Sequence, residues 1–262
     1  MTNTPHADPA ARLCAALALG VASALGHAAT PPGRPDSMIQ APTQAQAQAD
    51  TLSARQQAIV PIAAHAAAGD MPRLAEALDQ GLDAGMAVSD AREILVQLYA
   101  YAGFPRSLNA LGELMKVTGA RRQRGIQDAP GREPSRPIPK GDALLAAGTD
   151  NQTRLSGAPV TGPLFDFAPV ANEYLRAHLF GDIFERDNLD WQSREIATVS
   201  MLSALQGVDS QLQSHMGISM NVGISAGQLT QLTQVLADRV GPEAATRARG
   251  ALSRQIAARA KR

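Results

Sequence analysis

The sequence predicts an all-α fold, and its composition and its pattern both support this prediction. Aromatic residues make up 3% of the 262 residues and hydrophobic residues 45%, so the core has to be built from Leu, Ile, Val, Met and Ala, which suit closely packed helices. Apolar residues return at three- and four-residue steps along much of the chain. Helix-start residues precede several of these runs, and glycines follow them. A chain of this length can bury a sizeable core and hold two small domains.

The first part of the chain reads as an export signal followed by a linker. Arg12 precedes a short apolar run, and small residues around 26–28 offer a cleavage site. The run is too short to span a membrane. We therefore predict a signal peptide over 1–28, a linker rich in Pro, Gln and Ala over 29–50, and a mature protein that is periplasmic or secreted. The alternative is a disordered extension or an artefact of the start site.

Residues 51–118 are predicted to hold the first helical unit. Its first helix begins after Ser53, which forms a capping-box pattern with Gln56, and ends near Gly69. Its second helix spans about 72–82, where leucines recur on one side. These local signals define a pair of short helices.

Two more helices complete this unit. Ser89 is predicted to cap the third helix, whose apolar side runs to Tyr101. Gly103 and Pro105 then interrupt the pattern, because proline cannot continue a helix from the preceding turn. Helix resumes through the leucines of 108–114.

The second helical unit is predicted to span 164–262, after a long connector. Residues 119–163 are dense in Gly, Pro and Arg and show little periodicity, which predicts an irregular connector on the surface. Helix returns over 165–180, with Pro169 in a first helical turn. Asp190 is predicted to cap the next helix and to place Glu195 in its first turn, where the helix dipole favours a carboxylate.

His215 lies on the apolar stripe of the following helix. Leu212, Met216 and Ser219 share this stripe at steps of three or four residues, so the imidazole is expected to point toward the core. A Glu and a His that meet across two antiparallel helices can work as orienter and base. The alternative is structural, because a lone His on such a stripe is more often a core residue and a first-turn Glu is often a partner of the helix dipole.

The two units show the same order of features at a spacing of about 137 residues, which predicts a duplication. The matched pairs are Leu52 with Leu189, Gly69 with Gly207, Gly85 with Gly223, and Ser89 with Ser225. The copies differ at the residues that could carry chemistry. The first unit has Ala58 and Ala77 where the second has Glu195 and His215.

A set of motif residues in the segment 180–223 suggests a family. An Arg-Glu pair opens a helix, a His lies near the middle of the next helix, and an Asn-x-Gly turn follows. These residues are Arg194, Glu195, His215, Asn221 and Gly223. The pattern resembles the carboxymuconolactone decarboxylase family, whose further Tyr-x-Gly-x-Pro element is kept in the first unit at 101–105.

The resemblance implies both an architecture and an activity. It implies two helical units of the alkylhydroperoxidase D-like type, so that one chain imitates a dimer of single-domain relatives and a homo-oligomer, a trimer, replaces the family's hexamer. It also implies cofactor-free acid/base chemistry, of the lyase type, on a small carboxylated lactone or related ring compound. A non-catalytic helical binding or assembly module is the alternative function.

The resemblance also suggests roles for particular residues. Decarboxylation of a lactone acid requires a cation that holds the carboxylate and a group that returns a proton to carbon. The candidate catalytic residues are Glu195 and His215, and the candidate substrate-binding residues are Arg194, Arg186, Tyr101 and Arg106. Arg194 and Arg186 can equally be surface ion-pair partners of Glu195 and Glu185.

Thiol and metal chemistry are not predicted. Relatives of the alkylhydroperoxidase D type reduce peroxides through a Cys-x-x-Cys-x-x-x-His motif, but Val208 and Gln211 stand in the cysteine places before His215. The single cysteine, Cys14, lies in the predicted signal peptide, so a processed chain has no thiolate. The five histidines show no metal-ligand spacing, and no Gly-rich phosphate loop occurs. We therefore predict no metal and no cofactor.

The charge balance limits the partners. The 24 basic and 24 acidic residues cancel, which argues against a nucleic-acid partner. The short basic cluster 121–124 is predicted to be a solvated helix end. The predicted partners are a small-molecule substrate and further copies of the chain, with no membrane span.

Overall fold

The computed structural model describes residues 50–261, which are largely helical and contain no strand. This confirms the predicted all-α fold for the described part of the chain. The predicted signal peptide, 1–28, and all of the predicted linker except Asp50 lie outside the described residues. Among the described helices, none combines the length and the apolar character that crossing a membrane requires.

The first half forms four helices in the predicted order. They are α2 (Ala54–Ala68), α3 (Met71–Asp83), α4 (Val88–Gln97) and α5 (Tyr99–Gln123). Ser53 and Gln56 form the predicted capping box, and Gly69 ends α2 with a φ of 79°. Gly103, with a φ of 81°, breaks the helical path inside α5, at the point where the glycine and proline pattern predicted an interruption.

The predicted cap of α4 is wrong. Ala87 occupies the N-cap position, and Ser89 lies inside the helix. Asp90 replaces the missing cap from within the first turn, because its Oδ2 accepts a hydrogen bond from the backbone N–H of Ala87 at 3.3 Å. A carboxylate at this position satisfies a free N–H and also suits the helix dipole.

Arg121 is not part of a solvated helix end, since it is only 3% exposed. Its guanidinium binds the carboxylates of Asp79 and Asp83 on α3, each at 2.8 Å, and that of Asp128 at 2.9 Å. These ion pairs join α5 to α3 and to the irregular segment that follows α5. Within the basic cluster 121–124, Arg121 therefore holds helices together and is not a solvated side chain.

The predicted irregular connector, 119–163, contains a helix. This helix is α6 (Asp142–Ser156), and α5 also extends into the segment as far as Gln123. α6 has few apolar residues, so the sequence shows little helical periodicity there. The helix packs through a close approach between Gly148 and the backbone of Arg176. A Cβ at Gly148 would lie 1.9 Å from the backbone oxygen of Arg176, so only glycine fits at this contact.

The second half begins with short helical pieces and ends with four longer helices. They are α7 (Pro163–Phe167), α8 (Pro169–Tyr174), a π-helix (Leu175–Ile183), α9 (Trp191–Ala204), α10 (Asp209–Asn221), α11 (Ala226–Arg239) and α12 (Pro242–Arg259). Pro169 is the first residue of α8, as predicted.

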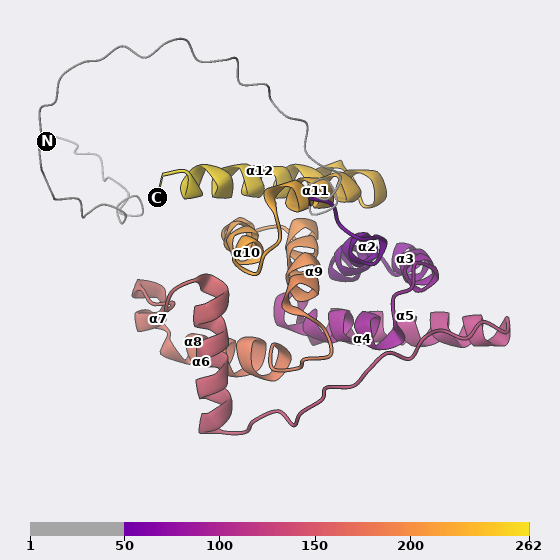
Figure 1. Ribbon diagram of the computed structural model, residues 1–262, viewed down its shortest axis with the longest axis horizontal. Coiled ribbons are helices and arrows are strands. Elements are labelled where there is room, and N and C mark those ends of the chain that lie inside the picture. The colour runs from indigo at the N-terminus through magenta and orange to yellow at the C-terminus, as the bar shows by residue number, and fades with distance from the viewer. Residues whose placement is uncertain (1–49, 262) are drawn as a thin grey trace, which may run out of the picture. The chain divides into compact units, whose positions relative to one another are not determined.

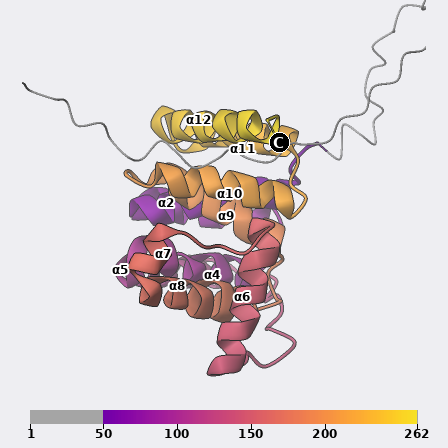
Figure 2. The same ribbon diagram turned by 90° about the vertical axis from the view of Figure 1, so that its left-hand side faces the viewer.

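The two halves pack against each other through α2 and α9. Figure 1 shows α11 and α12 on one side of α9 and α10, with α4 and α5 on the other side, and Figure 2 shows the same order from a second direction. In the first half α2 contacts α3, and α5 contacts both α3 and α4; in the second half α9 contacts α10, and α12 contacts both α10 and α11. This correspondence agrees with the predicted duplication, which stays a prediction.

Two apolar clusters support the candidate site. The larger one surrounds the contact between α2 and α9 and includes Ile59, Ile62, Ile196 and Val199. The smaller one lies where α6, the π-helix and α10 meet, and it includes Leu155, Phe180, Phe184 and Ile218. Tyr101 packs against both clusters, and Trp191 packs against the smaller one.

Candidate functional site

Asp190 fixes the start of α9 as predicted. Its Oδ1 accepts a hydrogen bond from the backbone N–H of Ser193 at 2.8 Å. Because the helix begins at Trp191, Glu195 is its fifth residue and lies in the second turn, so the predicted first-turn position is wrong. The helix dipole acts mainly on the first turn and therefore contributes little to holding this carboxylate.

Glu195 and His215 meet across α9 and α10. The Nδ1 of His215 lies 2.8 Å from the Oε2 of Glu195, so the contact expected between these two side chains is present. Glu195 is 0% exposed and His215 is 7% exposed. The Nε2 of the imidazole makes no hydrogen bond to residues 50–261, and it is not enclosed by them. One ring nitrogen is thus held by the carboxylate, and the other is left for a different partner.

The second carboxylate oxygen of Glu195, Oε1, is buried and has no hydrogen-bond partner among the described residues. The hydroxyl of Ser219, one turn beyond His215 on α10, is also buried without a hydrogen-bond partner among the described residues. An unpaired buried polar atom costs about 1–3 kcal/mol, and the missing partner is often a ligand or an ordered water. Among the described residues, His215 thus makes the one side-chain hydrogen bond to the buried carboxylate of Glu195.

Tyr101 brings the first half of the chain to this pair. Its ring meets that of His215 edge to face, with centroids 5.7 Å apart. Its hydroxyl lies 3.2 Å from the Oγ1 of Thr198 on α9, and Gln97 donates to the same Oγ1 at 2.8 Å. Burial, with the charge of Glu195 acting in the same direction, raises the pKa of Tyr101, so the phenol stays protonated. Of the predicted substrate-binding residues, this one lies beside the imidazole.

Arg186 and Arg194 bind a carboxylate that the sequence interpretation missed. Glu93 of α4 receives two hydrogen bonds from Arg186, at 2.7 and 2.9 Å, and one from Arg194, at 3.2 Å. Arg194 is 0% exposed and is not placed to make the predicted substrate contact. It is also not a surface ion-pair partner of Glu195, which was the alternative. The partner of Arg186 is likewise Glu93, where Glu185 was the alternative. Neither arginine is brought to His215.

A spacing of four residues was the available signal for Glu93. Glu93, Gln97 and Tyr101 follow each other at this step, and all three side chains face α9. On α9 Arg194 and Thr198 repeat the same step. A polar stripe on each of two apolar helices predicts that the two stripes meet.

Arg106 lies elsewhere. Its guanidinium donates to the backbone oxygen of Ala67 near the end of α2. Free carbonyls at a helix C-terminus attract cations, so Arg106 caps the C-terminal end of α2. The structure shows no contact between Arg106 and the Glu195–His215 pair.

The stability of the protein is expected to fall in acid through Glu93. Burial raises the pKa of Glu93, but the hydrogen bonds from Arg186 and the charge of Arg194 outweigh it and lower the pKa from 4.5 to about 2. The unfolded chain therefore takes up a proton first, and stability present above pH 4.5 is lost as the pH falls through about 2. The loss amounts to about 3 kcal/mol.

Urea denaturation at a series of pH values measures this loss. The Glu93→Gln variant, which cannot titrate at this position, should lose correspondingly less stability over the same pH range. An equal acid loss in both proteins would contradict the assignment to Glu93.

Two cavities stand out among residues 50–261, and neither is lined by Glu195 or His215. The larger, about 940 Å³, lies between α11 and α12. The smaller, about 590 Å³, lies where α9 begins and α10 ends, and the motif residues Asn221 and Gly223 line it. Within residues 50–261 no group of three or more His, Cys, Asp or Glu side chains is arranged to hold a metal ion.

Comparison with known proteins agrees with the motif. Residues 169–254 match the sequence model of the carboxymuconolactone decarboxylase family, a range that runs from α8 into α12 and includes Glu195 and His215. A search of curated proteins found no match to the chain. The first half lies outside the matched range, so its kinship with the second half stays a prediction. The segment 169–254, which carries the Glu195–His215 pair, is thus similar to the carboxymuconolactone decarboxylase family.

Proposed function

We propose that the chain is a cofactor-free acid/base enzyme of the lyase type that acts on a small carboxylated lactone or related ring compound. In this proposal His215 transfers the proton and Glu195 orients and stabilises it. The observation that supports the proposal is the buried 2.8 Å hydrogen bond between Nδ1 and Oε2, while Nε2 has no hydrogen-bond partner among residues 50–261.

The geometry suits a proton transfer at Nε2. Glu195 accepts the hydrogen bond from Nδ1–H and so fixes the tautomer and the orientation of the ring. When the carbon–carbon bond to the substrate carboxylate breaks, carbon dioxide leaves and its bonding electrons stay on the ring compound. For this step Nε2 first takes up a proton from solvent, and the carboxylate of Glu195 stabilises the resulting imidazolium. The imidazolium then delivers the Nε2 proton to carbon and returns to the neutral Nδ1–H form. No thiol enters the scheme.

The first half of the chain contributes Tyr101 to this proposal. Its protonated phenol packs against the imidazole edge to face and restricts the ring from a second side. In this proposal a group other than Arg186 or Arg194 holds the substrate carboxylate, because both arginines are engaged by Glu93.

Turnover tests the proposal directly. The purified full chain is incubated with a panel of small carboxylated lactones, and release of carbon dioxide is measured together with loss of the lactone by NMR. We expect turnover with at least one member of the panel. A folded protein that turns over none of them would favour the alternative, a non-catalytic helical binding or assembly module.

Self-association is a second part of the proposal, and exposed apolar side chains support it. α7 and α8 bury no residue within the chain, and Phe167 on α7 is 88% exposed. Leu164, Val170 and Tyr174 are exposed on the same two helices. Large apolar side chains that are exposed close together in a sequence often mark an interface. We propose that copies of the chain associate through it, as a trimer.

Replacing both Leu164 and Phe167 by serine is expected to shift the protein toward the monomer in sedimentation at micromolar concentration. Both side chains are exposed, so the fold should keep its thermal stability. Asp166→Ser on the same helix is the matched control and should sediment like the wild type. A wild-type protein that is already a monomer, or a double variant that sediments like the wild type, would contradict this interface.

A further inference from the structure

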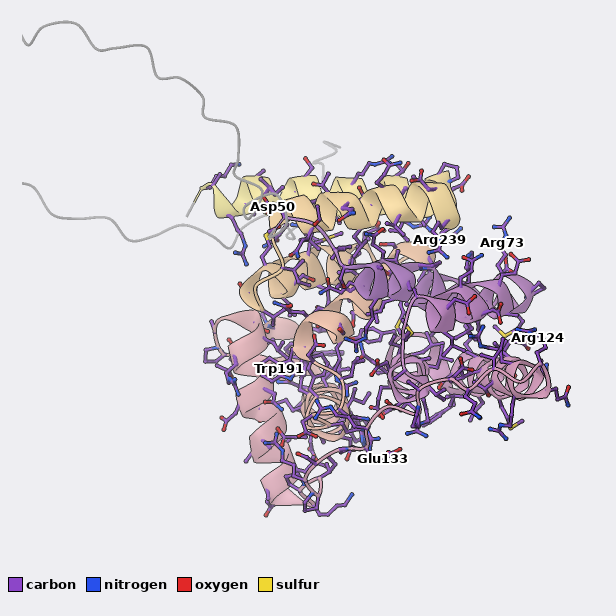
Figure 3. All side chains as sticks on the ribbon, turned by 45° about the vertical axis from the view of Figure 1, so that its right-hand side comes forward. Asp50, Arg73, Arg124, Glu133, Trp191 and Arg239 are labelled. Atoms are coloured by element: carbon purple, nitrogen blue, oxygen red, sulfur yellow. The ribbon has the colours of Figure 1, made fainter. Side chains whose placement is uncertain are left out.

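The smaller cavity has the features of a ligand site separate from the Glu195–His215 pair. It lies between the start of α9 and the end of α10, and Arg154 of α6 closes one side. Trp191, the first residue of α9, lies beside α6 in Figure 3. A concave site with an aromatic wall and a few polar groups is the usual form of a small-molecule site.

Arg154 is the cation of this cavity. Arg154 is exposed, and its guanidinium carbon lies 4.6 Å from the centre of the Trp191 ring, within the range of a cation–π contact. Within residues 50–261 no carboxylate pairs with Arg154, and its N–H groups make no hydrogen bond. A guanidinium that stacks on a ring still presents its N–H edge, and this edge matches the two oxygens of a carboxylate.

The other polar groups of the cavity are mostly satisfied. Asp190 accepts hydrogen bonds from the backbone N–H and the hydroxyl of Ser193, at 2.8 and 2.9 Å. Gln192 donates to the backbone oxygen of Val222 at 3.0 Å, and Asn221 donates to that of Leu155 at 2.8 Å. The free donors of Arg154 therefore dominate recognition here.

The charges of the lining limit the ligand. Arg154 carries one positive charge and Asp190 one negative charge, so a single anionic group is balanced at the guanidinium and a second would face the carboxylate of Asp190. Trp191 and Val222 supply apolar surface.

We propose that this cavity binds a small monocarboxylate with a flat apolar group, whose carboxylate pairs with Arg154 while its apolar part contacts Trp191 and Val222. The site goes beyond the proposed lyase activity, because neither Glu195 nor His215 lines it. Its occupation can therefore be measured whether or not the protein turns over any substrate.

Trp191 offers a direct readout, because it is the only tryptophan in the chain. Benzoate is titrated into the full chain while tryptophan emission is recorded, and calorimetry measures the same binding without relying on the indole. We expect a saturable change of emission, with the calorimetric Kd in agreement. Benzyl alcohol, which keeps the ring and lacks the carboxylate, should not bind. An emission change that is linear in benzoate would overturn the proposal.

Arg154→Met removes the charge and keeps an apolar side chain over the indole. It should weaken benzoate binding at least about tenfold, since hydrogen bonds to a charged group are lost. Arg249→Met, at an exposed arginine that lines the other cavity, is the matched control and should bind benzoate like the wild type. Equal affinity in the Arg154→Met and wild-type proteins would overturn the site, and inorganic phosphate that binds as tightly as benzoate would overturn the choice of a monocarboxylate.

Discussion

Replacing Glu93 by alanine is expected to lower the free energy of unfolding by about 3–5 kcal/mol, because it leaves a buried charge without its counterion. Arg194 is fully enclosed, and Glu93 is the only carboxylate that forms an ion pair with it among the described residues. The remaining contacts of Arg194, to the backbone oxygen of Arg186 and the amide oxygen of Gln97, are dipoles that cannot neutralise it. Urea denaturation at neutral pH measures the loss.

Glu133→Ala is the matched control for this variant. Glu133 also forms an ion pair with an arginine, Arg92, but its side chain is 70% exposed. An exposed pair contributes little, so the control should lose at most about 1 kcal/mol. If both variants lost the same small amount, the charge of Arg194 would have to be met by water, and its assignment as a buried ion would fail.

Replacing His215 by glutamine is expected to reduce turnover at least about 100-fold, since an amide cannot transfer the proton that an imidazole transfers. The amide N–H₂ of glutamine can still donate to Glu195, so the buried carboxylate keeps a partner and the fold should survive. Alanine would be a poorer choice, because it would leave the carboxylate unpaired at a cost of about 3–5 kcal/mol. Initial rates of carbon dioxide release, with a melting curve for each protein, separate the two effects.

Gln211→Ala provides the reference for that experiment. Gln211 is exposed on α10, the helix that carries His215, and its loss should leave the rate unchanged. Turnover that persists in His215→Gln at the wild-type rate would remove His215 from the chemistry. It would leave the pair a structural role only.

Local signals predicted well where the structure depends on local contacts. The caps at Ser53 and Asp190 and the break at Gly103 depend on residues within three or four positions, and all are present. The meeting of Glu195 and His215 followed from stripes on two adjacent helices joined by a short turn. The error about the turn that holds Glu195 came from placing it too close to a cap that was itself correct.

Interactions between segments that are distant in the chain were not predicted from the sequence. Glu93 precedes Arg194 by about 100 residues, and the four-residue spacing of each polar stripe does not by itself say which distant stripe it meets. α6 is stabilised by the approach of Arg176 to Gly148, a contact that leaves no apolar period in the sequence. The cavity lined by Arg154 and Trp191 has the same origin, because its two main residues come from different helices.

The polar contacts between α4, α5 and α9 bear on how the protein can be divided. Arg194 and Thr198 lie in the segment that matches the family model, yet their charge and hydrogen-bond partners, Glu93, Gln97 and Tyr101, lie in the other half. Expressed alone, the segment 169–254 would lack the carboxylate that pairs with Arg194 and the amide that donates to Thr198, on the side of α9 that meets α4 in the full chain. The segment that matches the family model is therefore shorter than the part of the chain that has to be moved together. A recombination event that moved 169–254 alone would transfer Glu195 and His215 but lose the polar contacts with α4 and α5.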